Sequence, residues 1–363
     1  METLINILFY FSSFLIVLSI IVFVHEFGHY YVAVLNKVKV EVFSIGFGKE
    51  IFGWNDKRGT RWKLCSLPFG GYVKMFGEDG FAPQKSISSK LSKYAFSNKK
   101  IYQRFLIVLA GPLANFIFGI IGFALIYTLI GKTVIPPVIN EVTNNSPAFN
   151  SGLMQDDKII KIDNNRIKNF NDIGTAINLY KKEFYNFEIL RNNKIIIKEI
   201  KPFYVVENFY GQDRRVAKIG ISSYEPIIKK YSFIESLYLG SQSTYQICSL
   251  TMKALNQMII GKGSFDDLGG PVKIAHFSGK MLEQGFLSFV NLIILLSISI
   301  GLINLFPIPM LDGGHLVLYT IEFLIGKPIN KNTQEKIFKF GFFIIITLAV
   351  LLTYNDIINL FNF

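Results

Sequence analysis

The chain has 363 residues, of which 50% are hydrophobic, 15% are aromatic and only 18% are charged. This composition excludes an ordinary soluble domain of the same size and favours a membrane protein. The net charge of +12 does not indicate a nucleic-acid partner, because Lys and Arg are spread among apolar blocks and form no basic stripe. We expect these charges to lie in loops that face an anionic lipid surface.

The first predicted element is a transmembrane helix over residues 5–36. Residues 5–24 carry no charge, and roughly 20 helical residues cover the hydrocarbon core of about 30 Å. The uncharged run continues to Asn36, interrupted only by Glu26, so the helix must tilt or project from the membrane. The segment lacks the basic start and the cleavage site of a signal peptide, and we expect it to remain in the mature protein.

Three further apolar segments predict a polytopic α-helical membrane protein with about four transmembrane helices. The second span contains Pro112, which predicts a kink or an unwound turn. Residues 134–222 are less apolar and contain short alternating runs such as KIIKID and KIIIKEI, which predict a small β-rich domain. Residues 233–260 show apolar positions at helical spacing, which favour an amphipathic helix on the membrane surface.

The distribution of Lys and Arg predicts the orientation. Residues 37–103 contain 13 Lys and Arg against 5 Asp and Glu, and residues 313–339 contain four Lys, whereas residues 1–4 and 355–363 contain neither Lys nor Arg. Because short cytoplasmic loops are enriched in basic residues, the termini and the β-rich domain are predicted to be extracytoplasmic. The predicted order is a helix over 5–36, a cytoplasmic loop over 37–103, a helix over 104–131, the β-rich domain over 134–222, the surface helix and a turn over 233–280, a helix over 286–309, a cytoplasmic loop over 310–339 and a helix over 340–360.

An HExxH motif, formed by His25, Glu26 and His29, lies in the second half of the first span. Positions i and i+4 share one helix face, so both imidazoles can bind one Zn²⁺. Glu26 can then take a proton from a water molecule whose pKa zinc lowers to about 7, while the metal polarises a peptide carbonyl. The alternative is a chance match. An ionisable group inside a span costs on the order of 2.5–3.5 kcal/mol for Asp, Lys or Arg, and this cost favours a functional site.

A zinc ion that keeps a reactive water needs a third protein ligand. We predict Asp312 in NLFPIPMLDGGH, because it lies at the end of the third span, at the same membrane depth as the HExxH motif. Gly313 and Gly314 allow a turn that would aim it inward. The alternative for Asp312 is a turn that merely ends a helix at the interface. His276 and His315 are predicted to be ordinary polar residues.

HEFGH in the first span, GPLAN in the second and LDGG after the third occur in this order along the chain. In this combination the chain resembles the site-2 protease family, peptidase family M50, and within it the branch of the bacterial sigma-E regulator protease. The resemblance implies zinc binding by His25, His29 and Asp312, a general base at Glu26, and substrate positioning by Asn304 and Asn115.

The resemblance also implies accessory parts. FSIGFGKEIFGW (43–54) and LPFGGYVKMFGE (67–78) resemble the family's membrane-associated β structure, which could hold an extended substrate by edge pairing. Part of 134–222 resembles one PDZ domain, with Asp156 where the pattern usually has Gly. Such a domain could either bind peptide C-termini or filter out bulky substrates, and both functions stay open. LGGPVKIA (268–275) is similar to a family turn that leads toward the third span.

We therefore predict a zinc metalloendopeptidase of the bacterial inner membrane. It would cut single-pass membrane proteins within or near their transmembrane segment, for example anti-sigma factors or signal-peptide remnants. One alternative is a membrane-anchored zincin whose third ligand is a Glu of a later helix, but no suitable ExxxD or ExxxN pattern follows. The other is a non-catalytic PDZ scaffold, against which the intact HExxH motif and Asp312 argue.

Overall fold

The computed structural model describes residues 2–78, 91–180, 182–209, 212–260 and 269–361. The chain divides into two compact units, and each is described by itself. Of the described residues, the first comprises 2–123, 240–248 and 269–361, and the second comprises 124–239 and 249–260.

Within the described residues, four helices are long and apolar enough to cross a membrane, which confirms the predicted number of spans. α2 is helical throughout, including Pro112, so the unwound turn, one of the two predicted alternatives, is wrong, and the kink stays a prediction. A proline removes one backbone donor, and neighbouring groups in a membrane helix can compensate for that loss. The helices are α1 (Glu2–Leu35), α2 (Ile101–Leu129), α7 (Phe286–Asn304) and α9 (Lys331–Phe361).

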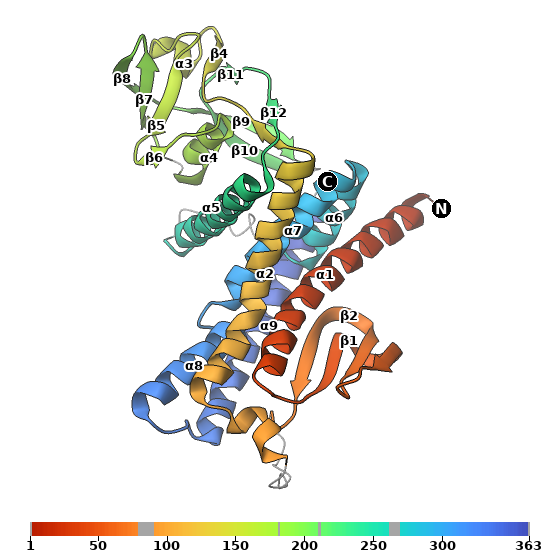
Figure 1. The fold of residues 1–363 in the computed structure, drawn as a ribbon. Coiled ribbons are helices and arrows are strands. Elements are labelled where there is room, and N and C mark those ends of the chain that lie inside the picture. The colour runs from red at the N-terminus through yellow and green to blue at the C-terminus, as the bar shows by residue number, and fades with distance from the viewer. Residues whose placement is uncertain (1, 79–90, 181, 210–211, 261–268, 362–363) are drawn as a thin grey trace. The chain divides into compact units, whose positions relative to one another are not determined.

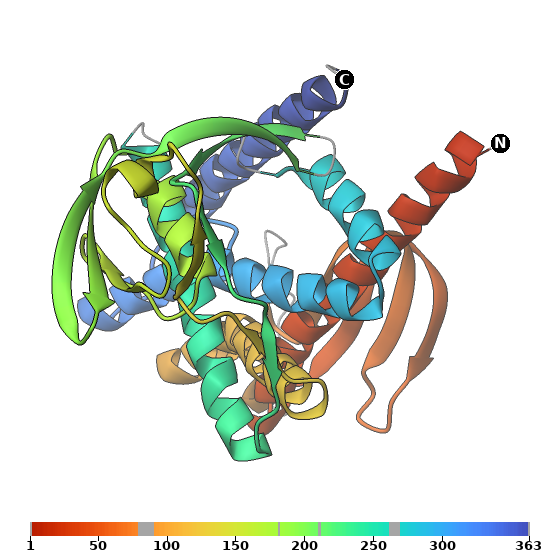
Figure 2. The ribbon, with the colours of Figure 1, turned by 90° about the horizontal axis from the view of Figure 1, so that it is seen from above.

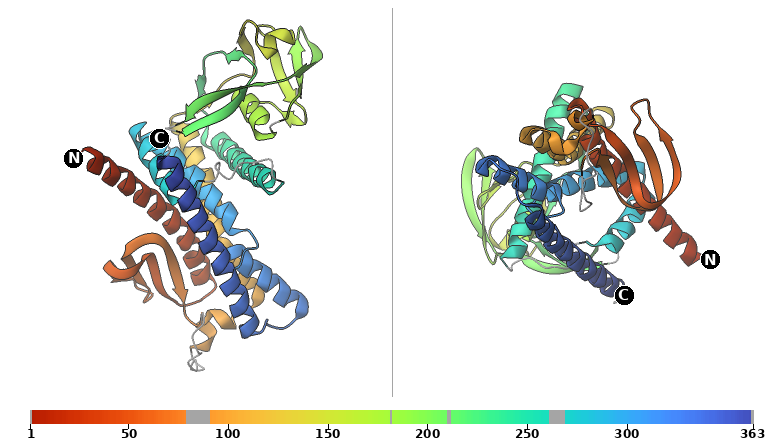
Figure 3. Two further views of the ribbon diagram at one scale, coloured as in Figure 1. Left: turned by 180° about the vertical axis from the view of Figure 1, so that it is seen from behind. Right: turned by 90° about the horizontal axis from the view of Figure 1, so that it is seen from below.

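Small residues bring these helices close together near the HExxH motif. A Cβ atom at Gly28 of α1 would lie 2.3 Å from the carbonyl oxygen of Ala110 in α2, and one at Gly111 would lie 2.3 Å from His29 Nε2. Gly301 of α7 approaches α2 in the same way. Close backbone approach at small residues is the usual packing mode of membrane helices, and Figures 1 and 3 show α1, α2 and α7 side by side.

The first unit also contains two shorter helices. α6 (Pro271–Glu283) starts with a proline at its first turn, which suits a helix N-terminus, and lies between α1 and α9 (Figure 2). α8 (Asp312–Ile325) begins at the LDGG motif, where the sequence predicted a loop. Leu316, Leu318 and Tyr319 are buried, and their packing explains why this segment is helical. Asp312 therefore starts a helix and does not end one.

The segment between α1 and α2 forms an antiparallel sheet from β1 (Val40–Asn55) and β2 (Arg61–Met75). Each strand bends, and Gly46 and Gly70 have φ values of 85° and 104°, which glycine adopts easily. Because of the bends, residues 42–45 pair with 61–64, residues 40–45 pair with 71–75, and residues 50–55 pair with 61–65. Within the described residues, segment 71–75 is thus an edge of the sheet.

The sheet packs against the helices through a shared apolar core. Phe43, Val40 and Met75 of the sheet are buried together with Tyr30 of α1 and Ile107 of α2. The 3₁₀ turns η1 (Ser92–Tyr94) and η2 (Phe96–Asn98) follow before α2, and Phe96 joins the same core. This burial fixes the sheet on the half of α1 that carries the HExxH motif.

The second unit contains the β-rich region predicted for residues 134–222. Ile159 and Ile162 of β5 and Phe187 and Ile189 of β7 are fully buried and form its core. Asp156 has a φ value of 66°, a conformation that glycine usually provides, and its carboxylate accepts a hydrogen bond from Tyr224. One sheet has the strand order β6 (Asn165–Arg166), β5 (Lys158–Ile162), β7 (Tyr185–Arg191), β8 (Lys194–Ile200). Three further two-stranded sheets are formed by β3 (Lys132–Val134) with β12 (Ile227–Lys229), β4 (Ile139–Val142) with β11 (Ile221–Ser223), and β9 (Phe203–Phe209) with β10 (Gln212–Lys218). The short helices of this region are α3 (Pro147–Asn150) and α4 (Asn171–Tyr180).

The predicted amphipathic helix is present as α5 (Phe233–Ile259). Ser232 and Glu235 form a capping box, in which each side chain bonds the other residue's backbone N–H. Ile234, Tyr238 and Tyr245 are exposed on the helix. Its position on a membrane surface stays a prediction.

Candidate metal centre and active site

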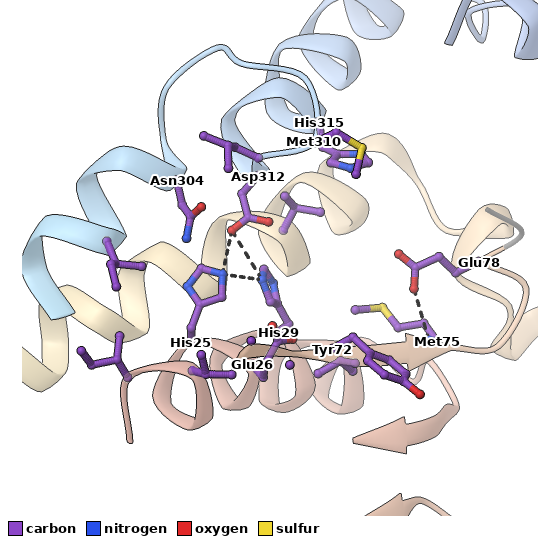
Figure 4. A pocket seen from close by; sticks show the side chains of 18 of the residues that line it. His25, Glu26, His29, Tyr72, Met75, Glu78, Asn304, Met310, Asp312 and His315 are labelled. Carbon is purple, nitrogen blue, oxygen red and sulfur yellow. Dashed lines mark hydrogen bonds and ion pairs between the residues drawn. The ribbon is translucent and has the colours of Figure 1, made fainter. Parts of the chain in front are cut away.

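The three predicted zinc ligands, distant in the sequence, lie together in the first unit (Figure 4). His25 and His29 project from one face of α1, as their i, i+4 spacing requires. The Asp312 Oδ2 atom, from the first residue of α8, lies 3.0 Å from His25 Nε2 and 3.5 Å from His29 Nε2. The two Nε2 atoms are 3.3 Å apart.

These atoms fit a bound divalent cation. In a tetrahedral zinc site with bonds of about 2.0–2.2 Å, neighbouring ligand atoms are separated by about 3.3–3.6 Å, close to the observed spacing. The Asp312 Oδ2 atom is buried and has no hydrogen-bond partner among the described residues. A buried carboxylate oxygen without a donor, facing two imidazole nitrogens, suits a cation that binds all three.

Hydrogen bonds on the far side of each imidazole orient it. His29 Nδ1 lies 2.9 Å from the carbonyl oxygen of Ile107, so Nδ1–H donates there and the Nε2 lone pair faces the metal position. His25 Nδ1 lies 3.2 Å from the side-chain amide of Asn115. Asn115 Oδ1 has no partner in the described part of the chain. Turning this amide by 180° lets Oδ1 accept the Nδ1–H of His25.

Glu26 faces the β1–β2 sheet and the same cavity as the ligands. A Cβ atom at Gly71 of β2 would lie 3.2 Å from Glu26 Cγ, and the backbone amide of Val73 interacts with the Glu26 carboxylate. The cavity has a volume of about 380 Å³. A carboxylate beside a metal position, with space for water and a peptide, can accept and return a proton.

Of the other His and Asn residues considered in the sequence, some line this cavity and others do not. Asn304, the last residue of α7, lines the cavity. Asn115 is fully buried and contacts His25, a metal-ligand contact that the sequence did not indicate. His315 also lines the cavity, with its ring 4.7 Å from that of Phe338, and burial lowers the pKa of its imidazole. His276 lies apart from the metal ligands, beside the ring of Tyr10.

An ion pair between Arg104 of α2 and Glu322 of α8 holds the helix that begins with Asp312. The two side chains are 2.9 Å apart, and the Glu322 side chain is 3% exposed. The Arg104 guanidinium also lies 4.8 Å from the ring centre of Tyr319, which lines the cavity. Sequence reasoning missed this contact, although an acidic residue within the apolar run HLVLYTIEFLI was a usable signal.

Asp56, in the turn between β1 and β2, joins the sheet to α1. Its carboxylate accepts hydrogen bonds from the Tyr30 hydroxyl at 3.0 Å and from Trp62 Nε1 at 3.1 Å. The backbone amides of Arg58 and Thr60 donate to the same carboxylate. Tyr30 follows His29 directly in the chain and lies one helical turn beyond Glu26. Asp56 therefore fixes the sheet relative to the helix of the HExxH motif.

Comparison with known proteins shows what the chain as a whole is similar to. The chain matches the family model described as Peptidase family M50 over residues 13–348. A Rickettsia conorii protein named "Putative zinc metalloprotease" is 41% identical over 354 residues, which cover 96% of this chain and 99% of that protein. Proteins of the same name from Agrobacterium fabrum and Clostridium acetobutylicum are 37% and 32% identical, and the matches cover 97% of this chain and 96% and 100% of theirs.

Proposed function

Because this chain belongs to peptidase family M50, the site-2 protease family, and is a zinc metalloprotease, we propose that it cuts single-pass membrane proteins within or near their transmembrane segment. The observation that carries this proposal is the position of the site. His25, Glu26 and His29 lie on a helix that is long and apolar enough to cross a membrane, and a second such helix, α7, ends at the same cavity. A metal centre at that position meets a substrate that is itself in lipid.

Each residue of the cavity is proposed to have a separate function in peptide hydrolysis. When bound, zinc polarises the peptide carbonyl and makes a water molecule more acidic. Glu26 accepts the proton of the attacking water and returns it to the departing amine. Asn304, at the cavity wall, is proposed to bind the substrate backbone, and Asn115 to hold His25 in the tautomer that presents Nε2.

The substrate must be unwound at the cleaved bond, because a helical carbonyl is already hydrogen-bonded. The edge segment 71–75 of β2 lines the cavity beside Glu26 and can pair with an extended peptide. Its backbone groups would replace the hydrogen bonds that the substrate helix loses. Helix-breaking or polar residues in the substrate would favour this unwinding.

The proposal also covers the orientation of the chain in the membrane and the function of the second unit. The basic loop over 37–103 favours a site that opens toward the cytoplasm of a bacterial inner membrane, with the β-rich unit outside. We propose that this unit is PDZ-like, since Asp156 forms the turn that the PDZ pattern needs although it is not glycine. It would bind or filter substrates before they reach the cavity.

The test uses the full chain in liposomes with a single-pass protein as substrate. Wild-type protein should cleave within or near the transmembrane segment, and Glu26→Gln should abolish cleavage while retaining zinc, since Glu26 is not a ligand. Full activity of Glu26→Gln would overturn the assignment of the base. Zinc binding without any cleavage by the wild type would favour a scaffold that keeps its metal.

A further inference from the structure

Glu78 is a charged residue of the cavity that neither binds the metal nor acts in the chemistry described above. It follows the end of β2, is exposed, and lines the same cavity as Glu26 and Asp312 (Figure 4). Its carboxylate accepts a hydrogen bond from the Met75 backbone amide at 3.2 Å. Lys74, on the same strand, pairs with Glu41. The single hydrogen bond from Met75 uses one oxygen of the Glu78 carboxylate, and an ionised carboxylate can accept further hydrogen bonds, for example from a substrate side chain.

The sheet edge leads from the catalytic base to Glu78. The Val73 amide interacts with the Glu26 carboxylate, and Met75, at the end of the edge, is hydrogen-bonded to Glu78. At about 3.3 Å per residue, these two steps span about 7 Å. A substrate paired along this edge would thus bring to Glu78 a side chain about two or three positions from the bond beside Glu26.

The side of the membrane on which Glu78 lies determines which flank of the substrate's apolar segment can reach it. Glu78 belongs to the segment 37–103, whose 13 basic and 5 acidic residues favour the cytoplasmic side. Single-pass membrane proteins carry Lys and Arg at the cytoplasmic end of their apolar segment by the same rule. The basic loop would repel such a substrate flank, whereas Glu78 offers the opposite charge at the cavity wall.

From this arrangement we infer that Glu78 is a specificity-determining residue that binds a Lys or Arg of the substrate on the cytoplasmic side of the cleaved bond. The inference rests on the proposed function and names the substrate class more closely. Discrimination arises from pairing one basic side chain and from repelling an acidic one at the same position. An exposed pair of this kind is expected to change kcat/KM by up to about fivefold.

A charge exchange tests the inference. Two single-pass substrates would differ only in carrying Lys or Glu at the cytoplasmic flank, and both would be incubated in liposomes with wild-type, Glu78→Gln and Glu78→Lys proteins. The wild type should prefer the Lys substrate, Glu78→Gln should cleave both alike, and Glu78→Lys should prefer the Glu substrate. Glu335→Lys is the matched control, because Glu335 is an acid of α9 that does not line the cavity.

The outcomes separate the inference from the proposed function. If the wild type cleaves both substrates and Glu78→Lys leaves their ratio unchanged, Glu78 does not select the flank. If Glu335→Lys shifts the ratio equally, overall surface charge explains the preference and the inference fails. If the zinc-loaded wild type cleaves neither substrate, the proposed function itself fails. Should Glu78→Lys not fold, an unchanged preference in Glu78→Gln still overturns the inference.

Discussion

The cavity has a helical side and a sheet side, and the two are built differently. On the helical side, side chains of α1 and α8 converge on one metal position, and groups of α2 hold each imidazole by a further hydrogen bond. On the sheet side, β2 presents backbone groups and small residues, and Asp56 anchors the sheet to α1. The difference suggests that the helical side performs the chemistry while the sheet side places the substrate.

The largest expected effect is on the helical side, at Asp312. Asp312→Ala removes one of the protein ligands, so the zinc content should fall well below the stoichiometric value and activity should fall at least about 100-fold. Metal analysis of the purified protein measures the first effect and substrate cleavage the second. Glu26→Gln is the control, since it should lose activity with its zinc in place. Unchanged zinc in Asp312→Ala would remove Asp312 from the ligand set.

How far the sequence predicts the molecule also differs between the two sides. The HExxH spacing and an isolated acid at the end of an apolar run were enough to predict which three side chains lie together, because ionisable groups in lipid are costly and therefore informative. The hydrogen bond from His25 to Asn115 was not predictable, since it depends on how two helices are rotated against each other. The helix after LDGG was missed because its burial against other elements, and not its local pattern, makes it stable.

The sheet side was less accessible to prediction for a physical reason. Its strands bend at glycines, so residues 42–45 pair on both sides, and no local pattern encodes such a register. Asp56 lies in an ordinary polar turn of the sequence, and only its four hydrogen bonds reveal its function. The resemblance to the site-2 protease family indicated β structure there but not how it is attached to α1.

The second expected effect concerns Asn115 and tests whether the helical side acts through ligand orientation. Asn115→Leu has nearly the same volume but cannot accept the Nδ1–H of His25, so zinc affinity should fall about 10- to 100-fold. Competition with a chelator measures this affinity. Asn115→Asp keeps an acceptor at this position and should retain zinc binding. A Leu variant with unchanged zinc affinity but a raised KM would instead support the predicted substrate role of Asn115.

The smallest expected effect lies on the sheet side and decides whether the two sides are separable. Asp56→Ala removes the acceptor shared by Tyr30 and Trp62 and should lower kcat/KM about tenfold, whereas Tyr30→Phe removes one hydrogen bond and should lower it about two- to fivefold. Zinc content should be normal in both variants, because neither residue touches a ligand atom. Since the Tyr30 hydroxyl acts through Asp56, the double variant should be no worse than Asp56→Ala. Two results would contradict this division: loss of zinc in Asp56→Ala, or fully additive losses of kcat/KM in the double variant. Either would show that the sheet supports the metal centre itself and does not only place the substrate.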